Sequence, residues 1–305
     1  MLLCLPSLQD CEKIVKRRDI MSKIRVCAPS RIYSAHPNGR FSVTGMIDYM
    51  SKIGFDGVDM SFDSLSAADD SYKTVLYAAK QRAVQKNLDI PSCHLPFYMP
   101  DPCDKVAMER FARDIRAGID AAAIMDIPLA VIHPIALHGK RHTAETWTRA
   151  NMEFLTPICE YAEKKGINLC IENMASSCEV DGDHLYGCTA AEILSLAEAL
   201  DVGVCWDFGH ANISGRPVND VLCLKNKLMT VHAHDNNGYT DSHIMPFDGR
   251  IDWEAVARAH AQIEYNGYIN VEVRAWDVPS DSYVREEFGR KILFVGQKIA
   301  RLIES

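Results

Sequence analysis

The sequence predicts an α/β fold, a single (β/α)8 TIM barrel, and three observations support that prediction. The chain has 305 residues, of which 48% are hydrophobic, so it can bury a substantial core. Short β-branched runs alternate with longer amphipathic stretches about eight times from Lys23 onward. No stretch rich in Pro, Gly or Ser divides this alternation into two units. Repeated strand–helix units of this number are what a closed parallel barrel requires, whereas doubly wound sheets contain fewer strands.

The expected strands follow one another at regular intervals along the chain. They span residues 24–28, 57–62, 90–95, 129–134, 168–173, 202–207, 230–235 and 268–274. Helices fill the intervals; those at residues 105–125, 146–165, 190–200 and 282–303 carry apolar residues at three- and four-residue spacing. Residues 1–22 fit no strand, so we expect an N-terminal extension, helical or disordered, before a barrel domain over residues 23–305.

Composition and charge count against several classes of protein. No apolar run approaches the length of about 20 residues that spans a bilayer, and the first residues lack the features of a signal peptide. The formal net charge of −8 counts against a nucleic-acid partner. The 11 cysteines include no C-x-x-C pair, so neither a disulfide framework nor a zinc ribbon is indicated. We expect a cytoplasmic protein without a membrane or nucleic-acid partner.

Histidines and acids stand at the carboxyl ends of the expected strands from the third to the eighth. They are His94, His133, Glu172, Asp207, His232 and Glu272. These strand ends meet at one face of a barrel, where the active sites of this fold are built. So many ionisable groups would repel and desolvate one another unless a cation neutralised them. Mixed imidazole and carboxylate donors favour manganese, cobalt, zinc or iron, so we expect a divalent metal cofactor.

Three cysteines, Cys93, Cys170 and Cys205, lie on the same strands as these groups. Side chains alternate between the two faces of a strand, and we expect all three thiols to point away from the barrel interior, toward the helices. They are therefore interpreted as core residues and not as metal ligands. The same alternation predicts that Trp206 packs against the helices.

The motifs of the last strands, and of the loop after the seventh, resemble those of a known superfamily. They read Glu172-Asn173, Trp206-Asp207-Phe208-Gly209-His210, His232-Ala233-His234-Asp235-Asn236, Asp241-Ser242-His243, Gly249-Arg250-Ile251-Asp252-Trp253 and Glu272. In this order and spacing they resemble the xylose isomerase-like barrel superfamily, over about residues 23–300. That superfamily includes sugar epimerases, inosose-processing enzymes and endonuclease IV.

The resemblance to the sugar epimerases implies a central metal held by Glu172, Asp207, His232 and Glu272, with His234 one step too far to take part. In those enzymes the two glutamates also serve as acid and base on a substrate that chelates the metal. A divalent cation makes this proton transfer feasible because it stabilises the enediolate that forms. Carboxylates on opposite faces of the substrate would invert a centre, whereas one carboxylate shuttling along one face would interconvert an aldose and a ketose.

Endonuclease IV uses a larger constellation that is also matched here. His94, His133 and Glu172 resemble the ligands of its first metal. Glu172 also belongs to the second set, together with Asp207, His232 and Glu272. His210, Asp241 and His243 resemble the ligands of the third metal. Together these residues would build a phosphodiester-cleaving centre. However, small-molecule members of the superfamily keep similar histidines, which can hydrogen-bond sugar hydroxyls. The segments after His94 and His133 are also apolar, unlike the basic loops of a DNA-binding protein.

Two features concern the substrate. The ketose 3-epimerases have an arginine a few residues beyond the histidine of strand seven, but this chain has Asn236-Asn237-Gly238-Tyr239 there. Arg250 and Arg274 are instead candidates either to bind a carboxylate or phosphate of the substrate or to tie loops together. The aromatic candidates for an apolar wall beside a sugar ring are Phe97, Tyr98, Phe208 and Trp276, whereas Trp253 is expected to serve packing.

We therefore predict a metal-dependent isomerase or epimerase of a sugar or cyclitol, with Glu172 and Glu272 as its catalytic residues. The alternatives are an endonuclease IV-like phosphodiesterase and an inosose-type dehydratase, which would use the same metal and base to expel a β-hydroxyl. The expected partner is a small carbohydrate. The sequence leaves the oligomeric state open, a homo-oligomer included.

Overall fold

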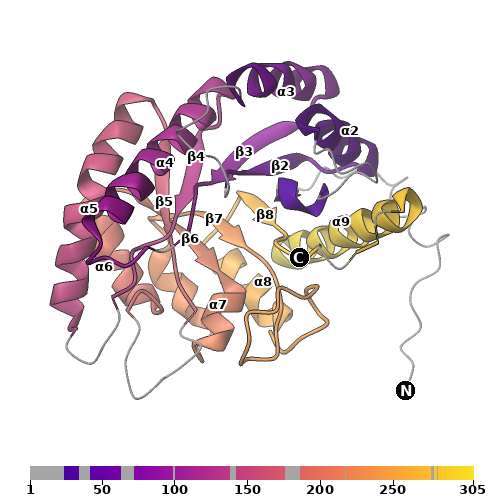
Figure 1. The fold of residues 1–305 in the computed structure, drawn as a ribbon. Coiled ribbons are helices and arrows are strands. Elements are labelled where there is room, and N and C mark those ends of the chain that lie inside the picture. Colours follow the sequence, from indigo (N-terminus) through magenta and orange to yellow (C-terminus); the bar gives the residue numbers. More distant parts are fainter. Residues whose placement is uncertain are drawn as a thin grey trace.

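The computed structural model describes residues 24–33, 42–62, 72–98, 100–137, 142–175, 186–216, 218–275, 278–279 and 281–305. The expected N-terminal extension, residues 1–22, lies outside these ranges. Within them, parallel strands close into a barrel in the order β1 to β8, with β8 paired to β1. Helices surround the barrel (Figure 1), which confirms the predicted (β/α)8 architecture.

Every expected strand is present. The strands are β1 (Arg25–Pro29), β2 (Gly57–Ser61), β3 (Asp89–His94), β4 (Leu129–Ile132), β5 (Asn168–Glu172), β6 (Gly203–Asp207), β7 (Leu228–His232) and β8 (Tyr268–Asn270). The strands expected at residues 129–134, 230–235 and 268–274 end earlier, because the chain leaves the regular ladder at the barrel mouth. Pairing nevertheless holds the later residues in place: the Glu272 amide donates to Ala233 O at 3.1 Å.

The helices between the strands begin at residues that favour helix starts. They are α2 (Val43–Ile53), α3 (Tyr72–Lys86), α4 (Lys105–Ile124), α5 (Ala144–Lys164), α6 (Ala190–Leu200), α7 (Phe208–Ile213), α8 (Trp253–Gln262) and α9 (Ser282–Glu304), with the 3-10 turns η1 (Ser30–Tyr33) and η2 (Val218–Leu224). Thr143 and Thr189 form capping boxes at α5 and α6, and Asp252 caps α8. In the described ranges, no helix has both the length and the apolarity needed to cross a membrane.

Two apolar layers lie on either side of the strands. The larger layer fills the space between the strands and the helices and includes Cys93 and Trp206, as predicted. The smaller layer consists of Leu129, Val131, Cys170 and Cys205. The prediction that all three cysteines face the helices is therefore wrong for Cys170 and Cys205. Each stands two residues before an inward acid of its strand, so the two-residue period turns it into the barrel as well.

Candidate metal centre

The ionisable side chains at the carboxyl ends of β3 to β8, and in the connections after β6 and β7, form three adjoining clusters. The central cluster is Glu172, Asp207, His232 and Glu272; the β3–β4 cluster is His94, His133 and Glu172; the loop cluster is His210, His234, Asp241 and His243. Among the described residues a fourth convergent group, Glu172, Cys205 and His232, overlaps the central one. In each cluster the potential ligand atoms lie within 4.8 Å of one another. The fold therefore brings together all the histidines and acids of the predicted site, and adds His234.

The central cluster surrounds one imidazole nitrogen. His232 Nδ1 lies 3.0 Å from Glu172 Oε1, 2.9 Å from Glu272 Oε2 and 3.9 Å from Asp207 Oδ2. The register of the barrel produces this convergence, since Asp207 is level with His232 and His232 is level with Asn270. All four side chains are buried, and Asp207 Oδ2 has no hydrogen-bond partner.

Opposite charges stabilise one another in this cluster. Burial by itself raises the pKa of the Glu172 carboxyl, but the neighbouring charges of His232 and His133 outweigh it and lower that pKa well below its usual value. Burial opposes a proton on His232, yet Cys205 and Glu172 raise its pKa well above the usual value. Carboxylates held ionised around an imidazole are a donor set that a divalent cation can occupy in place of the proton.

The β3–β4 cluster shares Glu172 with the central cluster. His133 Nε2 lies 3.1 Å from Glu172 Oε2 and 3.1 Å from His94 Nε2. His94 Nδ1 donates to the carbonyl of Leu95 at 2.8 Å, so its Nε2 carries a lone pair in the neutral ring. Burial is the main reason that the pKa of His133 is lowered. The Nε2 of His133 therefore lies between Glu172 Oε2 and the Nε2 of His94.

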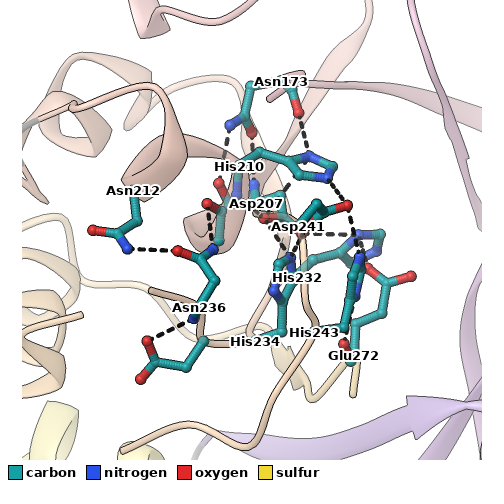
Figure 2. A network of polar contacts seen from close by, with 12 residues as sticks. Asn173, Asp207, His210, Asn212, His232, His234, Asn236, Asp241, His243 and Glu272 are labelled. Atoms are coloured by element: carbon teal, nitrogen blue, oxygen red, sulfur yellow. Dashed lines mark hydrogen bonds and ion pairs between the residues drawn. The ribbon is translucent and has the colours of Figure 1, made fainter. Parts of the chain in front are cut away.

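The loop cluster joins α7 and β7 to the connection that precedes α8 (Figure 2). His243 Nε2 lies 3.1 Å from Asp241 Oδ2, and His210 Nε2 lies 3.6 Å from the same oxygen. The sequence excludes His234 from the ligand set, but the structure places its Nε2 3.1 Å from Asp207 Oδ1 and 3.7 Å from Asp241 Oδ1. The spacing in the sequence could have predicted this position, because His232 and His234 are two residues apart and face the same side.

Asn173 and Asp235 hold the supporting backbone. The Asn173 side chain exchanges hydrogen bonds with the backbone of Asp207, at 2.6 and 2.9 Å. Asp235, which is fully buried, accepts hydrogen bonds from the backbone amides of Phe247 and Arg250 at 3.1 and 2.9 Å. The first pair fixes the end of β6, and the second fixes the loop that carries Asp241 and His243.

The guanidinium of Arg31 adds a positive charge to the centre, and the sequence analysis did not predict this residue. It lies in η1, directly after β1, and forms an ion pair with Glu272 Oε1. The predicted substrate-binding residues Arg250 and Arg274 have exposed side chains. The sequence shows a charged residue just after a strand, but it does not show that the partner is Glu272, 241 positions away.

The aromatic candidates separate into different environments. Phe97 lies against His94 and His133, with ring centroids 5.1 and 5.4 Å apart. Tyr98 turns away to Asp114 in α4. Phe208, predicted near the mouth, is instead buried against Trp253 and His260, because α7 begins at Phe208 and turns it toward α8. Trp276 lies outside the described residues.

The donors of these clusters fit divalent cations. The central cluster offers three carboxylates and one imidazole, and the loop cluster offers three imidazoles and one carboxylate. Asp207 Oδ2 and both ring nitrogens of His234 are buried polar atoms without a hydrogen-bond partner. Such atoms are normally satisfied in native proteins, and a cation at these positions would satisfy them.

The chain is similar in sequence to uncharacterized curated proteins. An uncharacterized protein of Methanocaldococcus jannaschii, MJ1311, is 33% identical over 171 residues, which cover 52% of this chain and 55% of that protein. An uncharacterized protein of Sinorhizobium fredii, y4fM, is 28% identical over 180 residues, covering 57% and 54% of the two chains. The chain thus spans about half the length of the curated relatives it matches.

Solved structures of similar shape include sugar epimerases. A D-tagatose 3-epimerase-like protein has a TM-score of 0.71 at 22% identity, over 92% of this chain and 100% of that one. A D-psicose 3-epimerase from Clostridium cellulolyticum H10 has a TM-score of 0.72 at 16% identity, over 91% and 99%. A 3-keto-D-glucoside 4-epimerase from E. coli has a TM-score of 0.68 at 15% identity, over 90% and 99%. At these identities the likeness shows the fold.

A family model covers most of the barrel. The model described as xylose isomerase-like TIM barrel matches residues 47–290, which contain β2 to β8 and every residue of the three clusters. The chain belongs to the xylose isomerase-like TIM barrel family.

Proposed function

We propose that this protein is a divalent-metal-dependent isomerase or epimerase that acts on a sugar or cyclitol. The observation that supports this most directly is the convergence of two buried carboxylates, Glu172 and Glu272, on His232 at 3.0 and 2.9 Å. Glu172 ends β5 and Glu272 lies two residues beyond β8, so they approach the centre from separate parts of the barrel mouth. The names of the structural neighbours, which are sugar epimerases, support the same class of reaction.

Glu172, Asp207, His232 and Glu272 would hold the metal. When bound, a divalent cation supplies Lewis acidity that stabilises the charge developing on a carbonyl oxygen. This set is rich in carboxylate oxygen, so manganese or cobalt suits it well. The chain's own contribution is to place two carboxylates where one can accept a proton from the carbon beside the carbonyl and the other can return it.

Other residues of the mouth would bind the substrate. Phe97 presents an aromatic ring beside the β3–β4 cluster, where it can pack against the apolar face of a sugar ring. His94 and His133 can hydrogen-bond sugar hydroxyls from the same side. Arg31, paired with Glu272, can hold that carboxylate in one orientation through Oε1 while Oε2 faces His232. Arg250 and Arg274 remain candidates for a more distant substituent.

The test is exchange of a carbon-bound substrate proton with solvent deuterium, measured by NMR on ketoses and inososes with the manganese-loaded protein. Glu172→Gln and Glu272→Gln should each abolish the exchange, because an amide cannot accept the proton. Glu254→Gln, at an exposed position in the first turn of α8, is the matched control and should exchange as the wild type does. Undiminished exchange in either site variant would disprove the proposed roles.

A phosphodiesterase of the endonuclease IV kind is the second candidate. It is supported by the contiguity of the three clusters, since Glu172 belongs to two of them and Asp207 approaches the third at His234. The net charge of −8 weighs against it. Cleavage of an abasic-site duplex by the zinc-loaded protein, lost in His94→Asn and His133→Asn, would replace the first proposal. A ketone product that has lost water would instead indicate the dehydratase.

A further inference from the structure

Arg285 is a buried arginine with unpaired nitrogens. It lies in the first turn of α9 with an exposed fraction of 9%, and no other lysine or arginine among the described residues is buried. Its Nη2 donates to the carbonyl of Val278 at 3.0 Å, whereas Nε and Nη1 have no hydrogen-bond partner. These two nitrogens carry three of the five N–H groups of a guanidinium. Buried donors are almost always satisfied in native proteins, so this side chain needs an explanation.

The guanidinium cannot avoid the cost of burial by losing its proton. Arginine stays charged in proteins, and a buried charge without a counter-ion is strongly unfavourable. Among the described residues, no carboxylate lies within ion-pair distance of Arg285, and the adjacent Glu286 forms an ion pair with Lys52. Tyr49 supplies no negative charge either. Its hydroxyl donates to the Arg285 carbonyl at 2.7 Å, and burial raises its pKa to about 12.

The position of Arg285 within α9 increases the local positive charge. The N-terminal end of a helix carries a partial positive charge, so it favours anions and disfavours cationic side chains. The hydrogen bond to Val278, which precedes the helix, turns the guanidinium back toward this end. Asp281 is used as the helix cap, since its side chain accepts the amides of Tyr283 and Val284 at 2.9 and 3.1 Å. The guanidinium and the helix end thus place two positive features together.

A second arginine shows how a guanidinium is satisfied elsewhere in this protein. Arg82, in α3, donates from Nε and Nη2 to the two carboxylate oxygens of Asp48, at 2.7 and 3.0 Å. The side chains of this pair are 36% and 41% exposed, so water could also solvate them. Arg285 has the same donors in a drier environment, where an unpaired charge is more costly. The comparison indicates that an anion would stabilise Arg285 more than any exposed arginine.

We propose that Arg285 and the N-terminal end of α9 form a binding site for a small oxyanion such as phosphate, distinct from the three clusters of the metal centre. The several oxygens of phosphate can accept more than one of the unpaired N–H groups, and its charge offsets both the guanidinium and the helix end. The anion is either free phosphate or a phosphate group carried by a substrate. The site goes beyond the proposed sugar reaction and does not depend on it.

The test titrates sodium phosphate into the full chain and follows binding by calorimetry. Arg285→Met, with a neutral side chain, should weaken phosphate binding by about tenfold or more, because hydrogen bonds to a charged donor are lost. Arg290→Met removes the same charge from an exposed position of the same helix and should bind phosphate as the wild type does. Phosphate that binds elsewhere, including at the metal centre, binds both variants equally and cancels in the comparison.

Thermal unfolding gives a second readout. A ligand that binds the folded state raises the melting temperature, so phosphate should raise that of the wild type and of Arg290→Met, and much less that of Arg285→Met. Without phosphate, Arg285→Met should be at least as stable as the wild type, because it removes a buried charge. A wild type that binds no phosphate, or equal phosphate affinities of wild type and Arg285→Met, overturns the proposal. If Arg285→Met does not fold, Arg285→Gln replaces it under the same criterion.

A titration with fructose 6-phosphate distinguishes the two sources of the anion. Tighter binding of this sugar phosphate than of inorganic phosphate, lost in Arg285→Met, assigns the site to a phosphate group of the substrate. Equal or weaker binding assigns it to the free ion. None of these titrations requires turnover. Absence of proton exchange on every sugar tested would therefore disprove the proposed function and leave the anion site unaffected.

Discussion

Asp235 accepts a hydrogen bond from the indole Nε1 of Trp253 at 2.7 Å, across the entire connection between β7 and α8. The same carboxylate accepts the backbone amides of Phe247, Arg250 and Ile251 at 3.1, 2.9 and 3.2 Å. One buried side chain thus organises the loop that carries Asp241 and His243. Hydrogen bonds to a buried charge are stronger than neutral ones, and their donors are costly to leave unpaired.

Replacing Asp235 should therefore loosen this loop. We expect Asp235→Asn to lower the free energy of unfolding by about 2 to 4 kcal/mol, because one oxygen becomes a donor that faces other donors. Urea unfolding followed by circular dichroism measures the change. Asp252→Asn is the control, since asparagine caps a helix as well as aspartate does, and it should change the stability by less than about 0.5 kcal/mol. Equal stabilities of the two variants would show that Asp235 has no special role.

Gly249 is required by a close approach and not by an unusual backbone angle. A Cβ atom there would lie 2.1 Å from Asp235 Oδ1 and 2.5 Å from the carbonyl oxygen of Asn236. Gly249→Ala should therefore lower the free energy of unfolding by about 2 kcal/mol or more. Gly215→Ala, at a φ of 62° with open space around the Cβ, should cost only about 1 kcal/mol. Thermal unfolding of the pair separates the two effects; a smaller loss in Gly249→Ala would contradict the close-contact explanation.

His260 should make the protein sensitive to acid. Burial lowers its pKa from 6.5 to about 4, so the folded protein keeps the ring neutral while the unfolded chain can protonate it. Its contribution is intact above the unfolded pKa and is lost as the pH falls toward the folded pKa, by about 3 kcal/mol in total. Unfolding free energies measured from pH 7 to pH 4 should fall more steeply for wild type than for His260→Asn. Parallel curves would show that His260 does not cause the loss.

Removing metal should destabilise the barrel. The central cluster gathers Glu172, Asp207 and Glu272 in a buried site, and a cation that binds only the folded state adds its binding free energy to the stability. At a free manganese concentration of 100 times the dissociation constant, the gain is about 2.7 kcal/mol. Calorimetry with and without a chelator measures it. In Asp207→Asn the gain should shrink markedly, and a gain equal to that of the wild type would exclude Asp207 as a ligand.

The general fold could be predicted from the sequence because it depends on local patterns. Repeated strand and helix periods predict a (β/α)8 barrel, and parallel strands necessarily bring their carboxyl ends to one face. The sequence alone therefore predicts that six side chains lie together at that face: His94, His133, Glu172, Asp207, His232 and Glu272. The inward direction of Cys170 and Cys205 follows from the same two-residue period, because each lies two residues before an inward acid, Glu172 or Asp207.

The remaining features were decided by tertiary structure. Phe208 follows Asp207 directly, but the start of α7 turns it under Trp253 and away from the mouth. Arg31 meets Glu272 only because β8 closes the barrel against β1. His234 joins Asp241 and His243 because Asp235 folds the intervening loop back onto the barrel. Sequence alone thus determined which side chains emerge at the mouth, since that follows from strand periodicity. Which of them touch was decided by barrel closure and loop packing, which depend on contacts between residues far apart in the chain.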